Sequence, residues 1–214
     1  MGKSSGGVNN YANVSGGIAI SASGRKLSQV AIRRIKASAE SITTLSDREV
    51  VLQLQKGISR YASVMGGVRE RVIKVANMDG YYGVTMLNSN SSEGIYLNKG
   101  FFNRKRNVVE SEYRKQYDSG FKNRTNRPIQ HTITHELAHT TWVSGYNSPK
   151  HRAAGVEIRT LYKKWQSDTK KRGYGTYASK NVDEFWAETV TKAVHGKSDK
   201  YTRAVKEIAK KYKL

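Results

Sequence analysis

The sequence contains no cysteine among its 214 residues. This absence excludes a disulfide framework, a cysteine-ligated zinc finger, an iron–sulfur cluster and a thiol nucleophile. Acidic side chains are scarce as well, because 17 Asp and Glu stand against 38 Lys and Arg, which gives a formal net charge of +21. Long apolar runs are also missing, so the sequence predicts no membrane span. Residues 1–13 lack the apolar segment of a signal peptide, so we expect a cytoplasmic location by default, with non-classical export or phage packaging as alternatives.

Length and composition favour one folded domain preceded by an arm. A chain of this length buries about 70% of the surface that its unfolded form exposes. Residues 1–25 are rich in Gly, Ser and Asn and hold few core-forming side chains. We therefore expect a flexible arm there, with at most a short strand over 14–20. Residues 26–214 then form a single domain, with helices and a sheet over 26–127 and helices over 128–214.

The hydrophobic periodicity predicts the order of the elements. Helical spacing runs from 26 to 42 and from 46 to 65, where Ser46 and Glu49 match a capping box and Gly66 follows the last turn. Val-, Ile- and Tyr-rich runs over 68–76, 81–87 and 94–97 are typical of antiparallel strands. Further helices are predicted over 128–142, 151–169, 181–194 and from 199 onward. Helices, a small sheet and more helices in that order favour an α+β fold.

The most informative pattern is His135-Glu136-Leu137-Ala138-His139. Residues four apart lie on one helical face, so both imidazoles can reach a single metal ion. Glu136, beside the first histidine, is placed to take a proton from water at that metal. The pattern is short, and the alternative is an ordinary helix with two surface histidines.

A catalytic zinc site needs a third protein ligand, for which the sequence offers three candidates. His131 lies about 6 Å farther along the helix than His135 and is out of reach. His151 follows a Gly/Pro turn, and its spacing does not match the metzincin pattern. Glu184 and Glu188 are one turn apart on a predicted helix, so one carboxylate can bind the metal while the other orients a ligating histidine. Spacing leaves a second interpretation of Glu184 equally open, since it also fits a helix cap.

A family resemblance lies in residues 177–188, which follow the HExxH motif of residues 135–139. Their sequence is Tyr-Ala-Ser-Lys-Asn-Val-Asp-Glu-Phe-Trp-Ala-Glu. The segment resembles the C-terminal protease domain of anthrax lethal factor and its relatives, which are zinc metallopeptidases of the gluzincin type. The resemblance covers about a quarter of the chain. It implies a zincin-like fold with a small antiparallel or mixed sheet and a helical C-terminal subdomain, and one Zn²⁺ held by His135, His139 and Glu184. It also implies Tyr177 as a hydroxyl donor to the oxyanion, and a protein or peptide substrate.

Three weaker expectations complete the predicted site. Glu188 is assigned to orient His135, with an exposed helix carboxylate as the alternative. His195 shares a helical face with Glu184, but a surface histidine is the favoured interpretation. By analogy with other zincins, a substrate backbone is expected to pair with the strand 94–98 as an edge strand.

The positive charge supports a different class of function. Lys and Arg cluster over 104–106, 114–127, 163–172 and 197–213, where they would attract polyanions in a salt-dependent manner. Tyr113 and Tyr117 stand among cationic residues and would allow base stacking. The competing hypothesis is therefore a basic nucleic-acid- or polyanion-binding protein of phage or mobile-element type, with a vestigial or structural zincin site.

Overall fold

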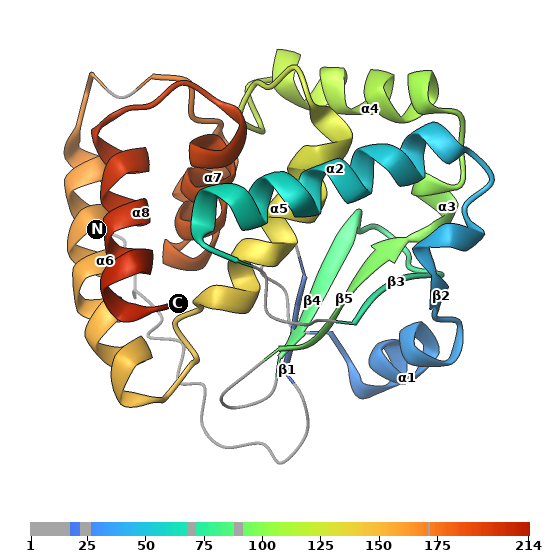
Figure 1. Ribbon diagram of the computed structural model, residues 1–214, viewed down its shortest axis with the longest axis horizontal. Coiled ribbons are helices and arrows are strands. Elements are labelled where there is room, and N and C mark those ends of the chain that lie inside the picture. Colours follow the sequence, from blue (N-terminus) through green and yellow to red (C-terminus); the bar gives the residue numbers. More distant parts are fainter. Residues whose placement is uncertain (1–17, 22–26, 68–71, 88–91, 171) are drawn as a thin grey trace, which may run out of the picture.

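A computed structural model describes residues 18–21, 27–67, 72–87, 92–170 and 172–214. The described chain is α+β, as the sequence predicts, with helices surrounding one small mixed sheet (Figure 1). Its elements are β1 (Ile18–Ser21), α1 (Gln29–Ala37), β2 (Glu40–Ser41), η1 (Ile42–Thr44), α2 (Arg48–Met65), β3 (Ile73–Ala76), β4 (Gly83–Leu87), β5 (Ser92–Asn98), α3 (Lys99–Phe102), α4 (Arg106–Asp118), α5 (Pro128–Thr141), α6 (Pro149–Ser167), η2 (Thr176–Ser179), α7 (Val182–His195) and α8 (Lys200–Tyr212).

The sheet has the strand order β1-β4-β5-β3-β2. The sheet is mixed, as the expectation of a small antiparallel or mixed sheet allows. β4 and β5 pair antiparallel, whereas β3 and β5 are parallel, so only the interpretation of all three central runs as antiparallel strands is wrong. The reason is that β5 returns from β4 and inserts beside β3 instead of extending a meander. β5 is therefore paired on both sides and cannot be the edge strand, which contradicts the expectation for residues 94–98. The outer side of β4 is paired with β1.

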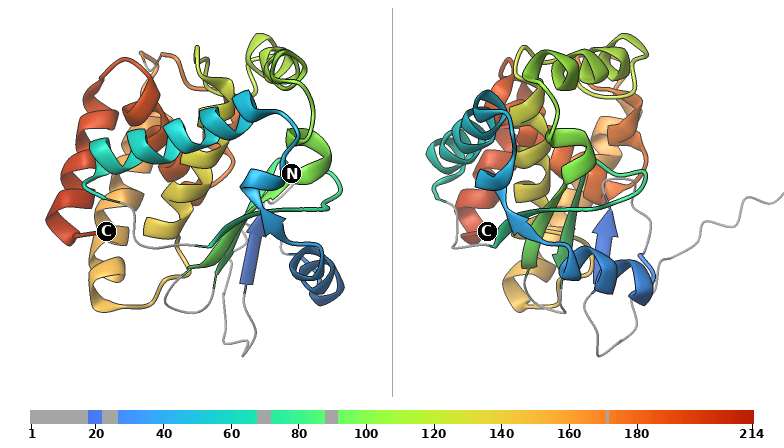
Figure 2. Two further views of the ribbon diagram at one scale, coloured as in Figure 1. Left: turned by 45° about the vertical axis from the view of Figure 1, so that its right-hand side comes forward. Right: turned by 90° about the vertical axis from the view of Figure 1, so that its right-hand side faces the viewer.

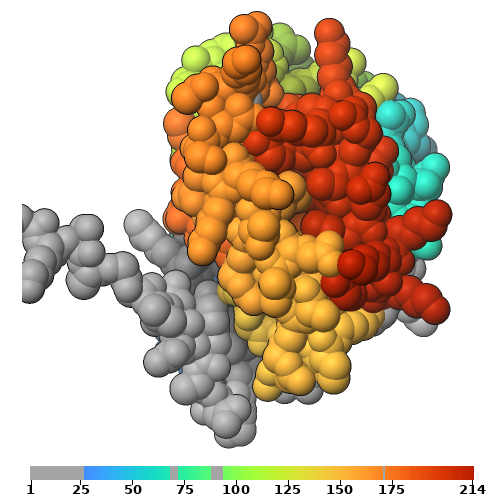
Figure 3. All heavy atoms as spheres, turned by 90° about the vertical axis from the view of Figure 1, so that its left-hand side faces the viewer, coloured from blue at the N-terminus to red at the C-terminus, as the bar shows by residue number. Residues whose placement is uncertain are grey.

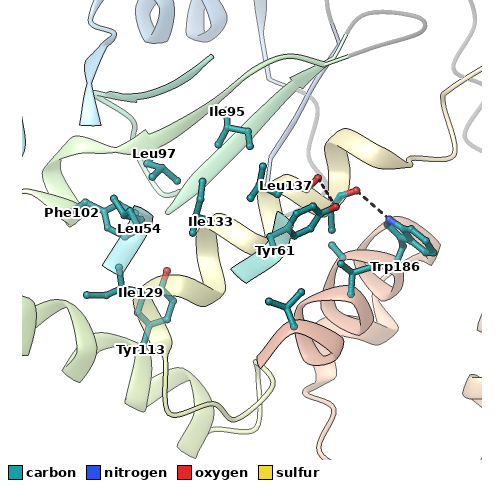
Figure 4. Packing of buried hydrophobic residues seen from close by; sticks show 14 of the residues in the cluster. Leu54, Tyr61, Ile95, Leu97, Phe102, Tyr113, Ile129, Ile133, Leu137 and Trp186 are labelled. Atoms are coloured by element: carbon teal, nitrogen blue, oxygen red, sulfur yellow. Dashed lines mark hydrogen bonds between the residues drawn. The ribbon is translucent and has the colours of Figure 1, made fainter. Parts of the chain in front are cut away.

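Helices cover the two faces of the sheet differently. α2 and α5 lie on one face, and α1 lies on the other (Figures 1 and 2). The larger core lies on the α5 side and includes Leu54, Ile95, Ile133, Leu137 and Trp186 (Figure 4). Alternation along the strands explains this division, because successive strand residues point to opposite faces.

α5 is the most deeply enclosed helix in the described chain. It begins with a proline in its first turn, and thirteen of its residues, Pro128 to Thr140, are buried. α2 and α7 pack against it along its length, and β4 lies beside it. A helix with so many buried polar residues needs internal partners for them, because unpaired buried polar groups are costly. This requirement points to the polar cluster described below.

The start of α2 and the end of α1 differ from the sequence prediction for identifiable reasons. α2 is capped by Asp47, whose carboxylate accepts the Glu49 N–H at 2.8 Å, and not by Ser46. Ser46 is engaged elsewhere, since its N–H donates to Asn103 Oδ1 at 2.7 Å. The first helix stops at Ala37 rather than at residue 42, because the following residues pair with β3 as β2. Gly66 ends α2 in the left-handed conformation, with φ of 84°, as expected for a glycine there.

The predicted arm, residues 1–25, lies mostly outside the described residues, apart from β1. β1 overlaps the region 14–20, where a short strand was expected, and extends one residue beyond it. Among the described helices, none has the length and apolarity needed to cross a bilayer.

Candidate metal centre

Three donor atoms from two helices converge in the interior. His135 and His139 extend from α5, and Glu184 extends from the first turn of α7. The Nε2 atoms of the two histidines are 3.1 Å apart, and Glu184 Oε2 lies 3.0 Å from His135 Nε2 and 3.5 Å from His139 Nε2. Ligands bound tetrahedrally to zinc at 2.0–2.1 Å are about 3.3 Å apart. The spacing of the three donors therefore suits one metal ion.

The position of Glu184 depends on how α7 starts and where it packs. Asn181 caps α7, with its side-chain oxygen accepting the Glu184 N–H at 2.8 Å. The Glu184 carboxylate turns toward the histidines instead of returning to the cap. Trp186 fixes α7 against α5, because its indole N–H donates to Ala138 O at 3.2 Å (Figure 4). Of the two interpretations that spacing left open, the structure thus favours the one in which this carboxylate faces the histidines.

The electrostatics of the cluster favour a cation. Burial opposes the charged forms of both partners, yet His135 and His139 hold the pKa of Glu184 at about 2. In return, Glu184 and Glu188 outweigh burial and raise the pKa of His135 to about 9. Both Glu184 oxygens and His139 Nδ1 are buried without a hydrogen bond of normal geometry. A buried polar atom without a hydrogen bond lowers the stability of the fold unless a charged group pairs with it. These residues therefore fit a bound metal ion.

Glu188, one turn beyond Glu184, joins two histidines of α5. Its Oε1 lies 3.0 Å from His135 Nδ1 and 3.1 Å from His131 Nε2, and its side chain is fully buried. The alternative of an exposed helix carboxylate is therefore wrong. A neutral histidine that donates from Nδ1 presents the lone pair of Nε2, which is the atom facing Glu184.

The described residues contain two groups that could hold a metal ion, and they share His135. One consists of His135, His139 and Glu184, and the other of His131, His135 and Glu188. Both need His135, and a neutral imidazole has only one ring nitrogen free to bind a metal. The donors of the first group have spacings that suit one metal ion, whereas in the second group His131 Nε2 is already hydrogen-bonded to Glu188 Oε1 at 3.1 Å, so the first group is the better candidate. Sequence reasoning excluded His131 as a ligand and missed this supporting position, although its four-residue spacing from His135 signalled a shared face.

Glu136 lies against β4. Its Oε2 accepts a hydrogen bond from the Thr85 hydroxyl at 2.7 Å, and the same hydroxyl lies 3.0 Å from the Glu136 backbone oxygen. A Cβ on Gly83 would stand 2.9 Å from Glu136 Cγ, so only glycine leaves room for this side chain. Glu136 Oε1 has no hydrogen-bond partner among the described residues. One oxygen is thus held and the other is free to exchange a proton. No feature of the sequence indicated Thr85 or Gly83.

Tyr177 reaches the cluster from η2. Its ring centroid is 5.8 Å from that of His135, and its backbone N–H is held by Phe121 O at 2.9 Å. Burial, together with the charge of Glu184, raises the pKa of the Tyr177 hydroxyl above its ordinary value. The hydroxyl therefore stays protonated at neutral pH and can donate a hydrogen bond.

The remaining histidines lie outside the cluster. His151 is buried and pairs with Ser148 Oγ at 2.6 Å at the start of α6. His195 is half-buried, with Nε2 3.1 Å from Thr134 Oγ1, so the expectation of an exposed surface histidine is wrong. Its place at the C-terminal end of α7, against α5, explains this burial.

No protein-family profile, no curated protein and no solved structure matches the chain.

Proposed function

We propose that this protein is a zinc-dependent endopeptidase of the gluzincin type with a zincin-like fold. The observation that supports this most directly is the convergence of His135 Nε2, His139 Nε2 and Glu184 Oε2 within 3.0–3.5 Å of one another. Two histidines and a glutamate form the ligand set of well-known peptidase zinc sites. The resemblance of residues 177–188 to the lethal factor protease domain points the same way.

Each side chain of the proposed site has a separate role in peptide-bond hydrolysis. A bound Zn²⁺ supplies a Lewis acid and lowers the pKa of water toward neutrality. Glu136 takes the proton from the attacking water at its free Oε1 and passes it to the leaving amine. Thr85 keeps the other oxygen of Glu136 in place during both transfers.

Two further residues support the chemistry. The Tyr177 hydroxyl donates to the oxygen of the scissile carbonyl as negative charge develops there. Glu188 holds His135 in the tautomer and orientation that expose Nε2. Both roles require side chains that are fixed by packing, and both residues are buried.

Metal content tests the site itself. Elemental analysis of the wild-type protein should give about one zinc per chain after reconstitution, and Glu184→Ala should lose most of it. The matched control is Glu207→Ala, which removes an exposed carboxylate from α8 and should leave the zinc content unchanged. Wild-type protein without zinc, or equal zinc in both variants, would refute the proposed ligand set.

Hydrolysis tests the assigned base. A proteome-derived peptide library, analysed by mass spectrometry, should show cleavages with the zinc-loaded wild type that disappear on chelation. Glu136→Gln should retain zinc and lose these cleavages, because the amide cannot accept the proton. Cleavage by this variant at the wild-type rate would exclude Glu136 as the base.

A further inference from the structure

A second candidate site lies at the opposite end of α7 from the metal ligands. A cavity of about 930 Å³ opens there between the loop before α5, the loop after α6 and the connection from α7 to α8. α6 and α8 lie side by side on the face that is turned to the viewer in Figure 3. The volume of the cavity falls within the range of ligand-binding pockets. Neither Glu136 nor any of the three proposed zinc ligands lines it.

The lining is strongly cationic. Its charged side chains comprise six Lys or Arg and two Asp, namely Arg124, Lys170, Arg172, Lys192, Lys197, Lys200, Asp168 and Asp199. The cations come from three different segments of the chain. Only the fold brings them together around one opening.

Both carboxylates of the lining are already engaged. Asp168 pairs with Lys200 Nζ at 2.7 Å and accepts the Tyr201 hydroxyl at 2.7 Å. Asp199 pairs with Lys192 Nζ at 2.8 Å and caps α8 by accepting the Tyr201 N–H at 2.9 Å. The first N–H groups of α8 are therefore occupied, so attraction for an anion comes from side chains and not from the helix end.

The remaining cations are available. Lys170, Arg172 and Lys197 are exposed, and none has a carboxylate partner in the part of the chain that the structure describes. Arg124 pairs with Asp118 at 2.8 Å, but both side chains are largely exposed, and such pairs exchange readily for another anion. Four positive groups thus face the cavity with little to neutralise them.

We propose that this cavity binds phosphate groups of a nucleic-acid backbone. A nucleic-acid strand carries a negative charge on every nucleotide, whereas most acidic peptides have uncharged residues between their carboxylates, and this continuous charge matches a protein whose net charge is +21. Two rings belong to the lining. Tyr201 is held through its hydroxyl by Asp168, and Lys200 Nζ lies 5.0 Å from its ring centroid. His195 is half-buried, with Nε2 3.1 Å from Thr134 Oγ1, so neither ring is free for base stacking. Binding is therefore independent of base sequence and does not depend on the metal centre.

Fluorescence anisotropy with a labelled single-stranded DNA oligonucleotide of mixed sequence tests the proposal over a series of salt concentrations. The triple variant Lys170→Glu, Arg172→Glu and Lys197→Glu should bind at least tenfold more weakly than the wild type at low salt. Loss of three phosphate contacts should also make the slope of log affinity against log salt shallower by about two. The milder set Lys170→Gln, Arg172→Gln and Lys197→Gln should show the same trend to a smaller degree.

The matched control reverses three exposed cations that do not line the cavity, namely Arg33 on α1, Arg48 at the start of α2 and Lys105 before α4. It removes the same net charge, so it should weaken binding less than threefold if the cavity is the site. Equal losses in the two charge-reversal variants would mean diffuse attraction and would overturn the proposal. So would the absence of binding by the wild type. Loss of binding on adding EDTA would indicate that the phosphates bind at the metal centre, and it would overturn the proposal. Displacement by polyglutamate as effective as by unlabelled DNA would indicate that the cavity binds acidic peptides, and it would overturn the proposal as well.

Discussion

The hydrogen bond between Thr85 and Glu136 offers a sharp test of how the sheet supports α5, the helix that carries two of the proposed metal ligands. Thr85→Val keeps the shape of the side chain but removes the hydroxyl that donates to Glu136 Oε2 at 2.7 Å. Both residues are fully buried, so bulk water does not readily replace the lost donor. Hydrogen bonds to a charged group contribute about 1.5–3 kcal/mol. We therefore expect Thr85→Val to lower the free energy of unfolding by about 2 kcal/mol.

For a chain of this size that loss corresponds to a decrease in Tm of roughly 6 °C. Thermal unfolding followed by circular dichroism measures it, and Thr85→Ser is the matched control because it restores the hydroxyl. Zinc content should stay unchanged in both variants, since Thr85 contacts none of the three proposed ligands. A Thr85→Val protein as stable as Thr85→Ser would refute the reasoning that this hydroxyl satisfies a buried carboxylate.

Three other predictions follow from the structure. His131→Phe removes the group that lies 3.1 Å from Glu188 Oε1 and should weaken zinc binding by about 10- to 100-fold in a chelator competition, whereas unchanged affinity would exclude a supporting role. Tyr177→Phe should lower kcat by about 100-fold with full zinc content and little change in KM, and an unaltered kcat would remove Tyr177 from the mechanism. Burial and neighbouring positive charges lower the pKa of His195 to about 3, so the folded protein keeps it neutral while the unfolded chain takes up a proton below about pH 6.5. Stability should thus fall by about 2 kcal/mol between pH 7 and pH 5 through this group, and His195→Asn should lack that part of the decline in urea unfolding at the two pH values.

The local parts of the site could be predicted from the sequence because they depend on neighbours along the chain. The four-residue spacing of His135 and His139 places both imidazoles on one face of α5 whatever the surroundings. Asn181 starts α7 by capping the Glu184 N–H, which is likewise a contact within one turn. The α+β class follows from the order of hydrophobic periods in the same way.

Contacts between distant segments required the tertiary structure. The direction of the Glu184 side chain was undetermined by spacing, and it is set by the packing of α7 against α5 through Trp186. Thr85 and Gly83 meet Glu136 only because β4 lies beside α5, and the pairing of β5 with β3 depends on how the hairpin inserts into the sheet. Periodicity carries no information on which faces meet across the chain. The sequence alone thus determined which side chains share a helix face, and the fold decided which faces come together.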